Sequence, residues 1–272
     1  MNKLNTTLAV AAGIAVLGGI SAQAQPVSGA LVSYQVANFS GTTWTDSSGN
    51  GDNATWSGSG LPTVSTGVTP NGSSALDFTG ITHSGFELAT PLSAASGFTV
   101  FAYFQLASTT GDGGGDGRNA LTGSALGGGF GTLEYDVYQG KQGALVEETT
   151  GLGSGSATLS TSAFSLIDVA VTSGAGNLNY RLNGAADGSA SAGAAFTHTL
   201  GTIGNNAGGG EPLDGLLSEI DIYSGVLTPT QIAQQEAYLT SEYVTTVPEP
   251  SSWVMLAGGL GTLVAVRRFR RS

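Results

Sequence analysis

Short apolar stretches alternate with clusters of glycine, serine and threonine along most of the chain. From Gly97 to Leu106 both alternating sets of positions are largely apolar or aromatic, which predicts a strand with two buried faces. Alternation also marks residues 167–171 and 178–182 as strands, and the Asn183-Gly184 dipeptide after them is typical of a hairpin turn. We therefore expect many short antiparallel strands, stacked as two sheets.

One helix is predicted after the last of these strands. Thr228 is a favourable N-cap residue, Pro229 suits the first helical position, and Gln231 completes a Thr-x-x-Gln capping box. The apolar positions that follow are Ile232, Ala233, Leu239 and Tyr243. The expected fold class is all-β, with one short helix near the C-terminal end.

The first 24 residues have the pattern of a secretory signal peptide. Lys3 precedes an apolar stretch from Leu8 to Ile20, and Ala22-Gln23-Ala24 forms a small-residue cleavage site. We expect cleavage after Ala24. Residues 25–246 then remain as one exported domain that is long enough to bury a substantial core.

The C-terminal tail, residues 247–272, carries a second targeting pattern. Its apolar run from Trp253 to Val266 is short for a membrane span, since a helix of this length reaches about 21 Å of a hydrocarbon core of roughly 30 Å. The predicted transmembrane helix is therefore a marginal anchor. The basic residues that follow stay on the cytoplasmic side of the inner membrane; they are Arg267, Arg268, Arg270 and Arg271.

Pro248, Glu249 and Pro250 precede this run, and the whole tail resembles the PEP-CTERM sorting signal, in which Pro-Glu-Pro, a short apolar helix and a basic end follow one another. The resemblance implies a Gram-negative bacterium that makes exopolysaccharide, with an exosortase that cuts near these three residues. It also implies transient inner-membrane anchoring of a protein destined for the cell envelope or extracellular matrix. An ordinary C-terminal anchor is the alternative interpretation.

Composition excludes several classes of function. Of the 19 acidic residues only Glu249 lies outside the exported domain, whereas five of the eight basic residues belong to the targeting segments. The domain keeps Arg118, Lys141 and Arg181. Nucleic acid is not an expected partner, because phosphate binding needs clustered lysine and arginine. The chain has no cysteine, so disulfides and thiolate metal sites are excluded.

Four segments, in order along the chain, resemble the laminin-G-like, or concanavalin A-like, jelly-roll domain of secreted bacterial proteins. They are residues 44–55, which include a glycine-rich loop of acids and amides, and residues 75–104, 168–184 and 214–223. The first and last segments are the most specific. The resemblance covers nearly all of residues 30–243 and implies an antiparallel two-sheet jelly-roll sandwich.

The first segment is a candidate calcium site, because calcium prefers carboxylate, amide and carbonyl oxygens. The resemblance implies a structural calcium completed by an acid of a late strand, where Glu219 or Asp221 replaces a carboxylate missing at Ser218. Asp112 and Asp116 form a weaker candidate of the same kind. Asx turns in a glycine-rich loop are the alternative interpretation. The main candidate ligands are Asp46, Asn50, Asp52, Asn53, Glu219 and Asp221.

The segment Glu219-Ile220-Asp221-Ile222 resembles the Glu-Ile-Asp-Ile core of retaining β-glucanases on the same fold. Alternation puts both acids on one strand face. Retaining hydrolysis needs a second carboxyl about 5 to 5.5 Å away, yet this chain has Tyr223 and Ser224 where the glucanases carry it. Glu134-x-Asp136, on another predicted strand, is the remaining source of a partner. We expect no enzyme activity, and hydrolysis through Glu219 is the alternative.

Aromatic residues outside the regular apolar pattern are candidates for stacking against sugar rings. Burial in the core is the alternative for each of them. The sequence thus predicts a non-enzymatic exported surface or matrix protein that binds carbohydrate or exopolysaccharide in a biofilm. A purely structural matrix component is a further alternative. The candidate ligand-binding aromatics are Trp44, Trp56, Tyr135 and Tyr138.

Overall fold

The computed structural model describes residues 24–93, 96–109, 118–123, 133–138, 140–146, 155–172, 177–191, 199–206 and 210–244. Residues 24–246 form one compact unit. The predicted sorting helix, and the predicted signal peptide apart from Ala24, lie outside the described residues. Within the described ranges, no helix combines the length and the apolar character that a membrane span needs.

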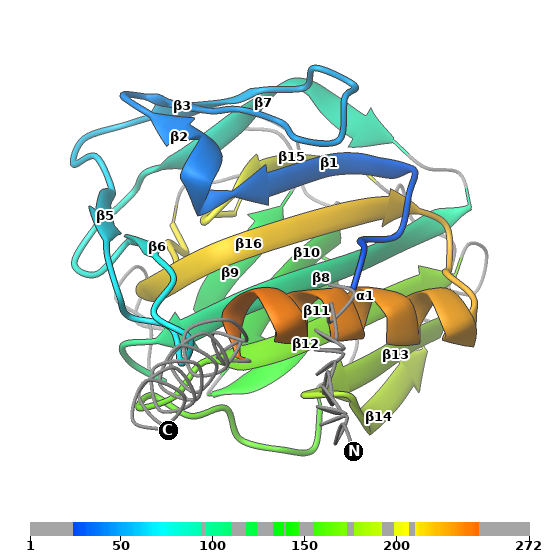
Figure 1. Ribbon diagram of the computed structural model, residues 1–272. Coiled ribbons are helices and arrows are strands. Elements are labelled where there is room, and N and C mark those ends of the chain that lie inside the picture. Colours follow the sequence, from blue (N-terminus) through cyan, green and yellow to red (C-terminus); the bar gives the residue numbers. More distant parts are fainter. Residues whose placement is uncertain are drawn as a thin grey trace, which may run out of the picture. The chain divides into compact units, whose positions relative to one another are not determined.

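Two antiparallel sheets, each of eight strands among the described residues, make up this unit (Figure 1). The first sheet has the order β14 (Ala185–Ser191), β13 (Asn177–Leu182), β12 (Ser165–Thr172), β8 (Gly97–Leu106), β16 (Gly215–Ser224), β6 (Ala75–Asp77) and β5 (Thr63–Ser65), and β1 (Ala30–Gln35) also pairs with β16. The second has the order β11 (Lys141–Val146), β10 (Leu133–Tyr138), β9 (Arg118–Gly123), β15 (Thr199–Ile203), β7 (Gly85–Ser93), β4 (Ala54–Ser57), β3 (Thr43–Trp44) and β2 (Phe39–Ser40). The all-β, two-sheet prediction is confirmed.

The main hydrophobic core lies between the two sheets. One face of β8, represented by Phe98, Val100 and Phe104, contributes to this core together with Phe86 of β7 and Leu121 of β9. Each such side chain contributes about 1.5–3 kcal/mol when it is fully buried. Burial on both inner faces is what holds the two sheets together.

The helix α1 (Pro229–Tyr243) covers the other face of the first sheet, in front of β8 and β12 in Figure 1. Phe101 and Tyr103 of β8 pack there in a second cluster with Tyr238 and Leu239 of the helix. The two buried faces predicted for β8 are therefore confirmed, since one faces the second sheet and the other faces α1.

Local sequence signals explain where α1 begins. The Thr228 hydroxyl accepts a hydrogen bond from the Gln231 backbone N–H at 3.3 Å, and the Gln231 side chain accepts one from the Thr228 N–H at 3.0 Å. This reciprocal pair is the predicted capping box, and Pro229 occupies the first turn. Such a box satisfies two backbone donors that the helix itself cannot pair.

The predicted hairpin is also present. Asn183 and Gly184 connect β13 to β14, and both have positive φ values, 50° and 82°. Two consecutive residues with positive φ are what a type I′ turn requires, and asparagine followed by glycine adopts that turn at little cost.

The beginning and the end of the unit meet. β1 pairs along β16, with Ser33 opposite Asp221 and Gln35 opposite Glu219. Before β1, the Val27 backbone N–H donates to the buried Gln235 side chain of α1 at 2.9 Å. A short 3-10 helix, η1 (Val36–Asn38), then redirects the chain from β1 into the second sheet.

Candidate functional site

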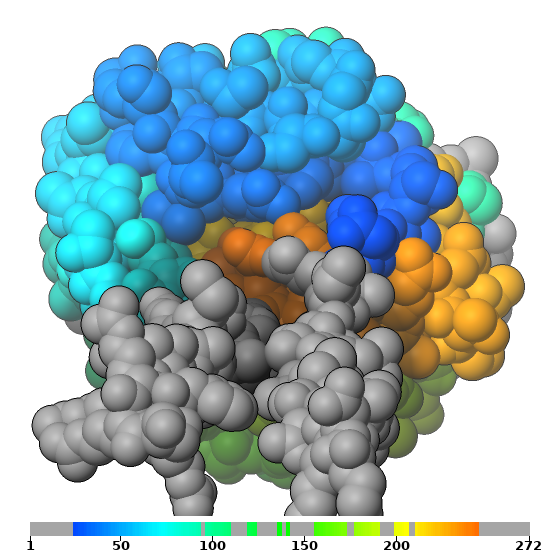
Figure 2. All heavy atoms as spheres, viewed as in Figure 1, coloured from blue at the N-terminus to red at the C-terminus, as the bar shows by residue number. Residues whose placement is uncertain are grey.

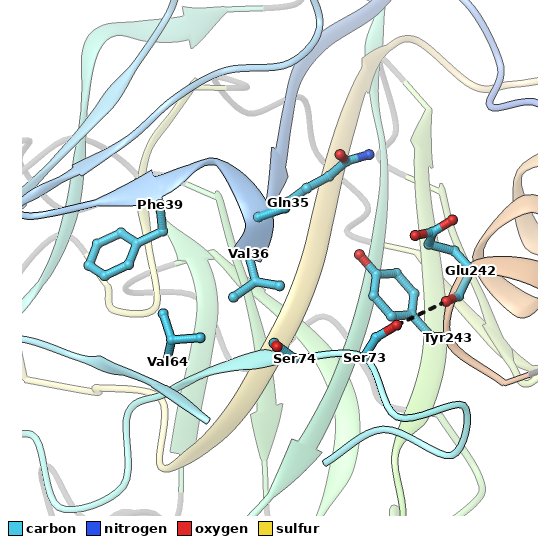
Figure 3. A pocket seen from close by; sticks show the side chains of 9 residues that line it. Gln35, Val36, Phe39, Val64, Ser73, Ser74, Glu242 and Tyr243 are labelled. Atoms are coloured by element: carbon cyan, nitrogen blue, oxygen red, sulfur yellow. Dashed lines mark hydrogen bonds between the residues drawn. The ribbon is translucent and has the colours of Figure 1, made fainter. Parts of the chain in front are cut away.

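A pocket of about 450 Å³ opens where η1, β5 and the C-terminal end of α1 approach one another (Figure 3). In Figure 2 the atoms of α1, in orange, lie recessed beneath the blue atoms of the N-terminal strands. The residues that line the pocket are Gln35, Val36, Ala37, Phe39, Val64, Ser73, Ser74, Glu242 and Tyr243.

The lining is divided between an apolar and a polar side. Val36, Phe39 and Val64 lie on one side, whereas the Gln35 amide, the Tyr243 ring and the Glu242 carboxyl lie on the other (Figure 3). Phe39 is held by an edge-to-face contact with Phe86 of the core, with ring centroids 5.8 Å apart. The apolar side is therefore fixed by core packing.

The polar side is fixed by hydrogen bonds to the last carbonyl groups of α1, which have no partner within a helix. The Asn71 side chain and the Ser73 hydroxyl both donate to the Glu242 carbonyl, the latter at 3.4 Å. The Asn71 backbone N–H donates to the Tyr243 carbonyl at 3.2 Å. These bonds join the loop before β6 to the end of α1 and set the width of the pocket.

Directly behind the polar side lies a buried pair of carboxyls, Glu219 and Asp221 of β16, which are 1% and 2% exposed. The Tyr243 hydroxyl donates to Glu219 Oε2 at 2.6 Å, and Gln35 Nε2 lies 3.4 Å from Glu219 Oε1. Gln235 Nε2 donates to Asp221 Oδ2 at 2.8 Å. Two residues of the pocket lining therefore contact the carboxyl pair directly.

The environment of this pair favours the protonated forms of the two carboxyls. Burial raises the pKa of Glu219 well above its ordinary value, and the neighbouring Asp221 raises it further. Burial also raises the pKa of Asp221 to about 6, although hydrogen bonds from Ser33, Glu219 and Gln235 act in the opposite direction. Adjacent carboxyls resist double ionisation, so this pair favours a state in which at least one of the two carboxyls is protonated.

A second cluster of charged groups ties α1 to the sheet. Arg181 Nε of β13 lies 2.8 Å from Glu236 Oε1 of α1 and 3.4 Å from Asp168 Oδ2 of β12. Burial and the neighbouring Glu236 together raise the pKa of Asp168 to about 8, although Arg181 acts in the opposite direction. The helix that closes the pocket is thus held at two places along its length.

Of the predicted calcium ligands, four lie in one loop, whereas Glu219 and Asp221 bond to side chains of α1. The four loop residues are Asp46, Asn50, Asp52 and Asn53, and Asp46 contacts both Asp52 and Asn53. The Asp46 carboxylate accepts hydrogen bonds from the backbone N–H groups of Ser33, Ser48, Gly51 and Asp52, at 2.9 to 3.3 Å. These N–H groups point their positive ends at the oxygens that a cation would use. The Asp46 carboxylate thus serves as the acceptor at the centre of the loop, as aspartate does in Asx-type turns.

The other loop residues predicted as calcium ligands also form hydrogen bonds within the protein. The Asn50 amide donates to the Ala30 and Leu31 carbonyls, and Asn53 Oδ1 accepts from the Asp46 N–H. The Asp52 carbonyl accepts from the Tyr34 hydroxyl. Glu219 and Asp221 face α1, and among the described residues no three acidic or histidine side chains cluster closely enough to hold a metal ion. Asp112 and Asp116 lie outside the described residues.

Two of the predicted sugar-stacking aromatics, Trp44 and Tyr135, are core residues, and a third, Trp56, is partly buried. Trp44 is fully buried, donates from Nε1 to the Gln35 carbonyl at 2.7 Å, and packs against Phe86. Tyr135 is 1% exposed within the main core. Trp56 is partly buried against the same core. Trp44 and Tyr135 lie on strands of the second sheet and point into the core between the two sheets, so neither ring is exposed for a sugar to stack on. The side chain of Tyr138 lies outside the description.

The second carboxyl source proposed from the sequence does not meet Glu219. Asp136 is buried in β10 of the second sheet, whereas Glu219 lies on the outer face of the first sheet beneath α1. The side chain of Glu134 lies outside the description. Glu219 is surrounded by Gln35, Tyr238 and Tyr243, none of which was predicted as a site residue. The sequence pattern marked only Tyr243, as an apolar position of the predicted helix.

Comparison with known proteins identifies two regions of the chain. Residues 79–233 match the family model for the concanavalin A-like lectin/glucanases superfamily, and residues 246–271 match the PEP-CTERM protein-sorting motif. No curated protein matches the chain. The sorting motif implies an exported protein of the Gram-negative cell envelope that an exosortase processes, as predicted from Pro248, Glu249 and Pro250.

Two solved structures illustrate the similarity in fold. Domain 4 of AbnA, an extracellular arabinanase from Geobacillus stearothermophilus solved with arabinotriose, aligns with a TM-score of 0.56 at 16% identity, over 78% of this chain and 98% of that chain. The Trypanosoma rangeli sialidase in complex with sialic acid aligns with a TM-score of 0.54 at 14% identity, over 81% of this chain and 34% of that chain. At these identities the likeness concerns the fold alone. Because the family model covers more than half of its residues, the chain belongs to the concanavalin A-like lectin/glucanases superfamily.

Proposed function

We propose that this protein is a non-catalytic exported carbohydrate-binding protein, which holds extracellular polysaccharide in the pocket between η1, β5 and the end of α1. The observation that carries the proposal is the division of the pocket lining into an apolar side with Phe39 and a polar side with Gln35 and Tyr243. Sugar rings have the same division, because their C–H faces pack on aromatic rings while their hydroxyls need hydrogen-bond partners.

The volume of the pocket supports a small saccharide as its occupant. Ligand sites typically enclose about 300–1,000 Å³, and this pocket encloses about 450 Å³. The pocket also opens to the surface beside the exposed Val64. A polymer is therefore able to present one or two sugar units to it while the remaining chain stays in solvent.

The burial of the carboxyl pair supports a non-catalytic role. Glycoside hydrolysis needs two carboxyls that reach the scissile bond from a substrate cleft. Glu219 and Asp221 are buried beneath α1 and bonded to Tyr243 and Gln235, respectively. A substrate reaches them only if the helix leaves the sheet.

Binding of the full-length protein, purified in detergent, to a glycan array and to immobilised polysaccharides tests the proposal. Phe39→Ala should weaken retention about tenfold, which corresponds to about 1.4 kcal/mol. Phe164→Ala is a matched control, because Phe164 is also a partly buried aromatic, stacked on Tyr103 at 5.1 Å, but lies outside the pocket. Absence of retention of the wild-type protein, or equal loss in both variants, would contradict the proposal.

A separate assay tests the absence of catalysis. We expect no reducing-sugar release from β-glucans by either the wild-type protein or Glu219→Gln. Release by the wild type that disappears in Glu219→Gln would establish the hydrolase alternative. Self-association of the protein without retention on any glycan would instead favour a structural matrix component.

A further inference from the structure

The apolar side of the pocket continues the core surface toward the edge of the first sheet. Val64 of β5 lies opposite Leu76 of β6, so the two side chains share one face of the sheet. Leu76 is fully buried, whereas Val64, on the last strand described in this sheet, is 45% exposed. Val64 therefore presents apolar surface at the pocket that the described fold leaves in contact with water.

Two further apolar side chains enlarge this surface. Val36 of η1 and Phe39 lie on the same side of the pocket as Val64 (Figure 3). A ligand that carries a methyl group in addition to its sugar ring is able to cover more of this surface than an unsubstituted sugar. Burial of one methyl group corresponds to about fourfold in affinity.

The polar side keeps two hydrogen-bonding groups for a ligand. Gln35 donates through Nε2 to the Tyr238 hydroxyl at 2.7 Å, whereas its Oε1 accepts no hydrogen bond from the described residues. The Ser74 hydroxyl also makes no hydrogen bond within the described part of the chain. The Tyr243 hydroxyl, in contrast, already donates to Glu219. The lining thus offers one amide acceptor and one hydroxyl donor.

We propose that the pocket prefers sugar units that carry an acetamido group over unsubstituted sugars. This inference rests on the proposed function and names the ligand class of the same pocket. An acetamido group combines an N–H donor, a carbonyl acceptor and a methyl group. The N–H would pair with Gln35 Oε1 and the carbonyl with the Ser74 hydroxyl. The methyl group would pack on Val36 and Val64, and the sugar ring on Phe39.

Competition binding with two tetrasaccharides of the same linkage tests this preference on the full-length protein in detergent. The probes are the β-1,4-linked tetramers of N-acetylglucosamine and of glucose, which differ only in the substituent at the second carbon of each ring. We expect the N-acetylated tetramer to bind about fourfold more tightly, as burial of one methyl group predicts. Equal affinities, or tighter binding of the glucose tetramer, would overturn the inference.

Val64→Thr replaces one methyl group of the lining with a hydroxyl of similar size, and should reduce the preference to twofold or less. The matched control is Val226→Thr, because Val226 is similarly exposed, at 43%, and lies outside the pocket. Both positions are on the surface, so neither change should affect folding. A preference that survives Val64→Thr, or falls equally in both variants, would overturn the inference.

The hydrogen bond assigned to Ser74 has its own test. Ser74→Ala should weaken binding of the N-acetylated tetramer about threefold or more, which is the size of one neutral hydrogen bond. Ser57→Ala is the control, since Ser57 is also partly exposed but lies in β4, outside the pocket. Unchanged affinity in Ser74→Ala would contradict the proposed orientation of the acetamido group.

The outcomes for this inference and for the proposed function are distinguishable. Equal binding of the two tetramers, with loss of both in Phe39→Ala, would overturn the preference and leave carbohydrate binding in place. Failure of both tetramers and of every polysaccharide to bind would overturn both proposals.

Discussion

Tyr243, the last residue of α1, donates a hydrogen bond of 2.6 Å to Glu219 of β16, and its ring also lines the pocket. The pocket wall and the buried carboxyl pair thus share one side chain. A change that loosens the end of the helix therefore affects both the binding surface and the stability of the domain.

Tyr243→Phe should lower the free energy of unfolding by about 1–3 kcal/mol, because it leaves a buried carboxyl oxygen without its donor. Urea unfolding measures the change. Tyr103→Phe is the matched control: Tyr103 stacks on Tyr243 at 5.1 Å, but its hydroxyl makes no hydrogen bond to the described residues. Equal losses in the two variants would mean that the hydroxyl of Tyr243 has no special role.

The carboxyl pair makes stability depend on pH. Burial raises the pKa of Asp221 from 3.8 to about 6 in the folded protein. Such a group contributes its full stability below the unfolded pKa and loses it as the pH rises through the folded pKa, because the unfolded chain releases the proton first. The contribution of Asp221 should fall between about pH 4 and pH 6, by at most about 1.4 kcal/mol per pH unit.

The difference between wild type and Asp221→Asn isolates this contribution. Partial burial raises the pKa of Asp46, but its hydrogen bonds outweigh burial and leave that pKa below its ordinary value, so Asp46 gives the opposite dependence at lower pH. Urea unfolding at several pH values should show the slope flattened in Asp221→Asn and retained in the surface control Glu87→Gln. Parallel curves for wild type and Asp221→Asn would contradict the prediction.

The Asp46 loop should fold without an added ion. Four backbone N–H groups and the Ser48 hydroxyl already surround its carboxylate. Asp46→Asn should cost about 2 kcal/mol, since an amide accepts at only one of its two atoms. We expect millimolar calcium to leave the melting temperature of the wild-type protein unchanged; a rise that disappears in Asp52→Asn would restore the calcium site predicted from the sequence.

The contribution of the capping box of α1 to the free energy of unfolding should be measurable by urea unfolding. Thr228→Ala should destabilise the protein by about 1 kcal/mol, because it removes the acceptor for the Gln231 N–H. Thr230→Ala, at an exposed position of the first turn, is the control and should be close to neutral. Equal changes in the two variants would show that the N-terminus of α1 does not depend on its cap.

The elements predicted correctly are those set by local signals. Thr228 and Gln231 are three residues apart and form the cap without help from the rest of the fold, as Asn183 and Gly184 form the turn. The alternation in β8 likewise indicated two buried faces, but not which partner covers each. That α1, rather than a third sheet, lies over Phe101 and Tyr103 follows from packing between distant parts of the chain.

The pocket was not predictable because its residues come from distant parts of the chain. Gln35 and Tyr238 are 203 residues apart and are joined by a hydrogen bond only because β1 and α1 both contact β16. Glu219 and Asp221 were correctly placed on one strand face. Because α1 packs over that face, both acids are buried rather than exposed in a cleft. The burial of Trp44 was also not predictable from local sequence, because the rings that pack against it, Tyr34 and Phe86, come from other strands.

The pairing of β1 with β16 constrains how the protein matures outside the cytoplasm. The strand that enters the exported space first has no partner in its sheet until the last strand follows, and loop closure over such a separation is slow. Until β16 follows, β1 is unpaired and β8 lacks its partner on one side. The sorting motif begins just beyond α1, so an exosortase that processes it acts on a chain in which every described strand precedes the motif.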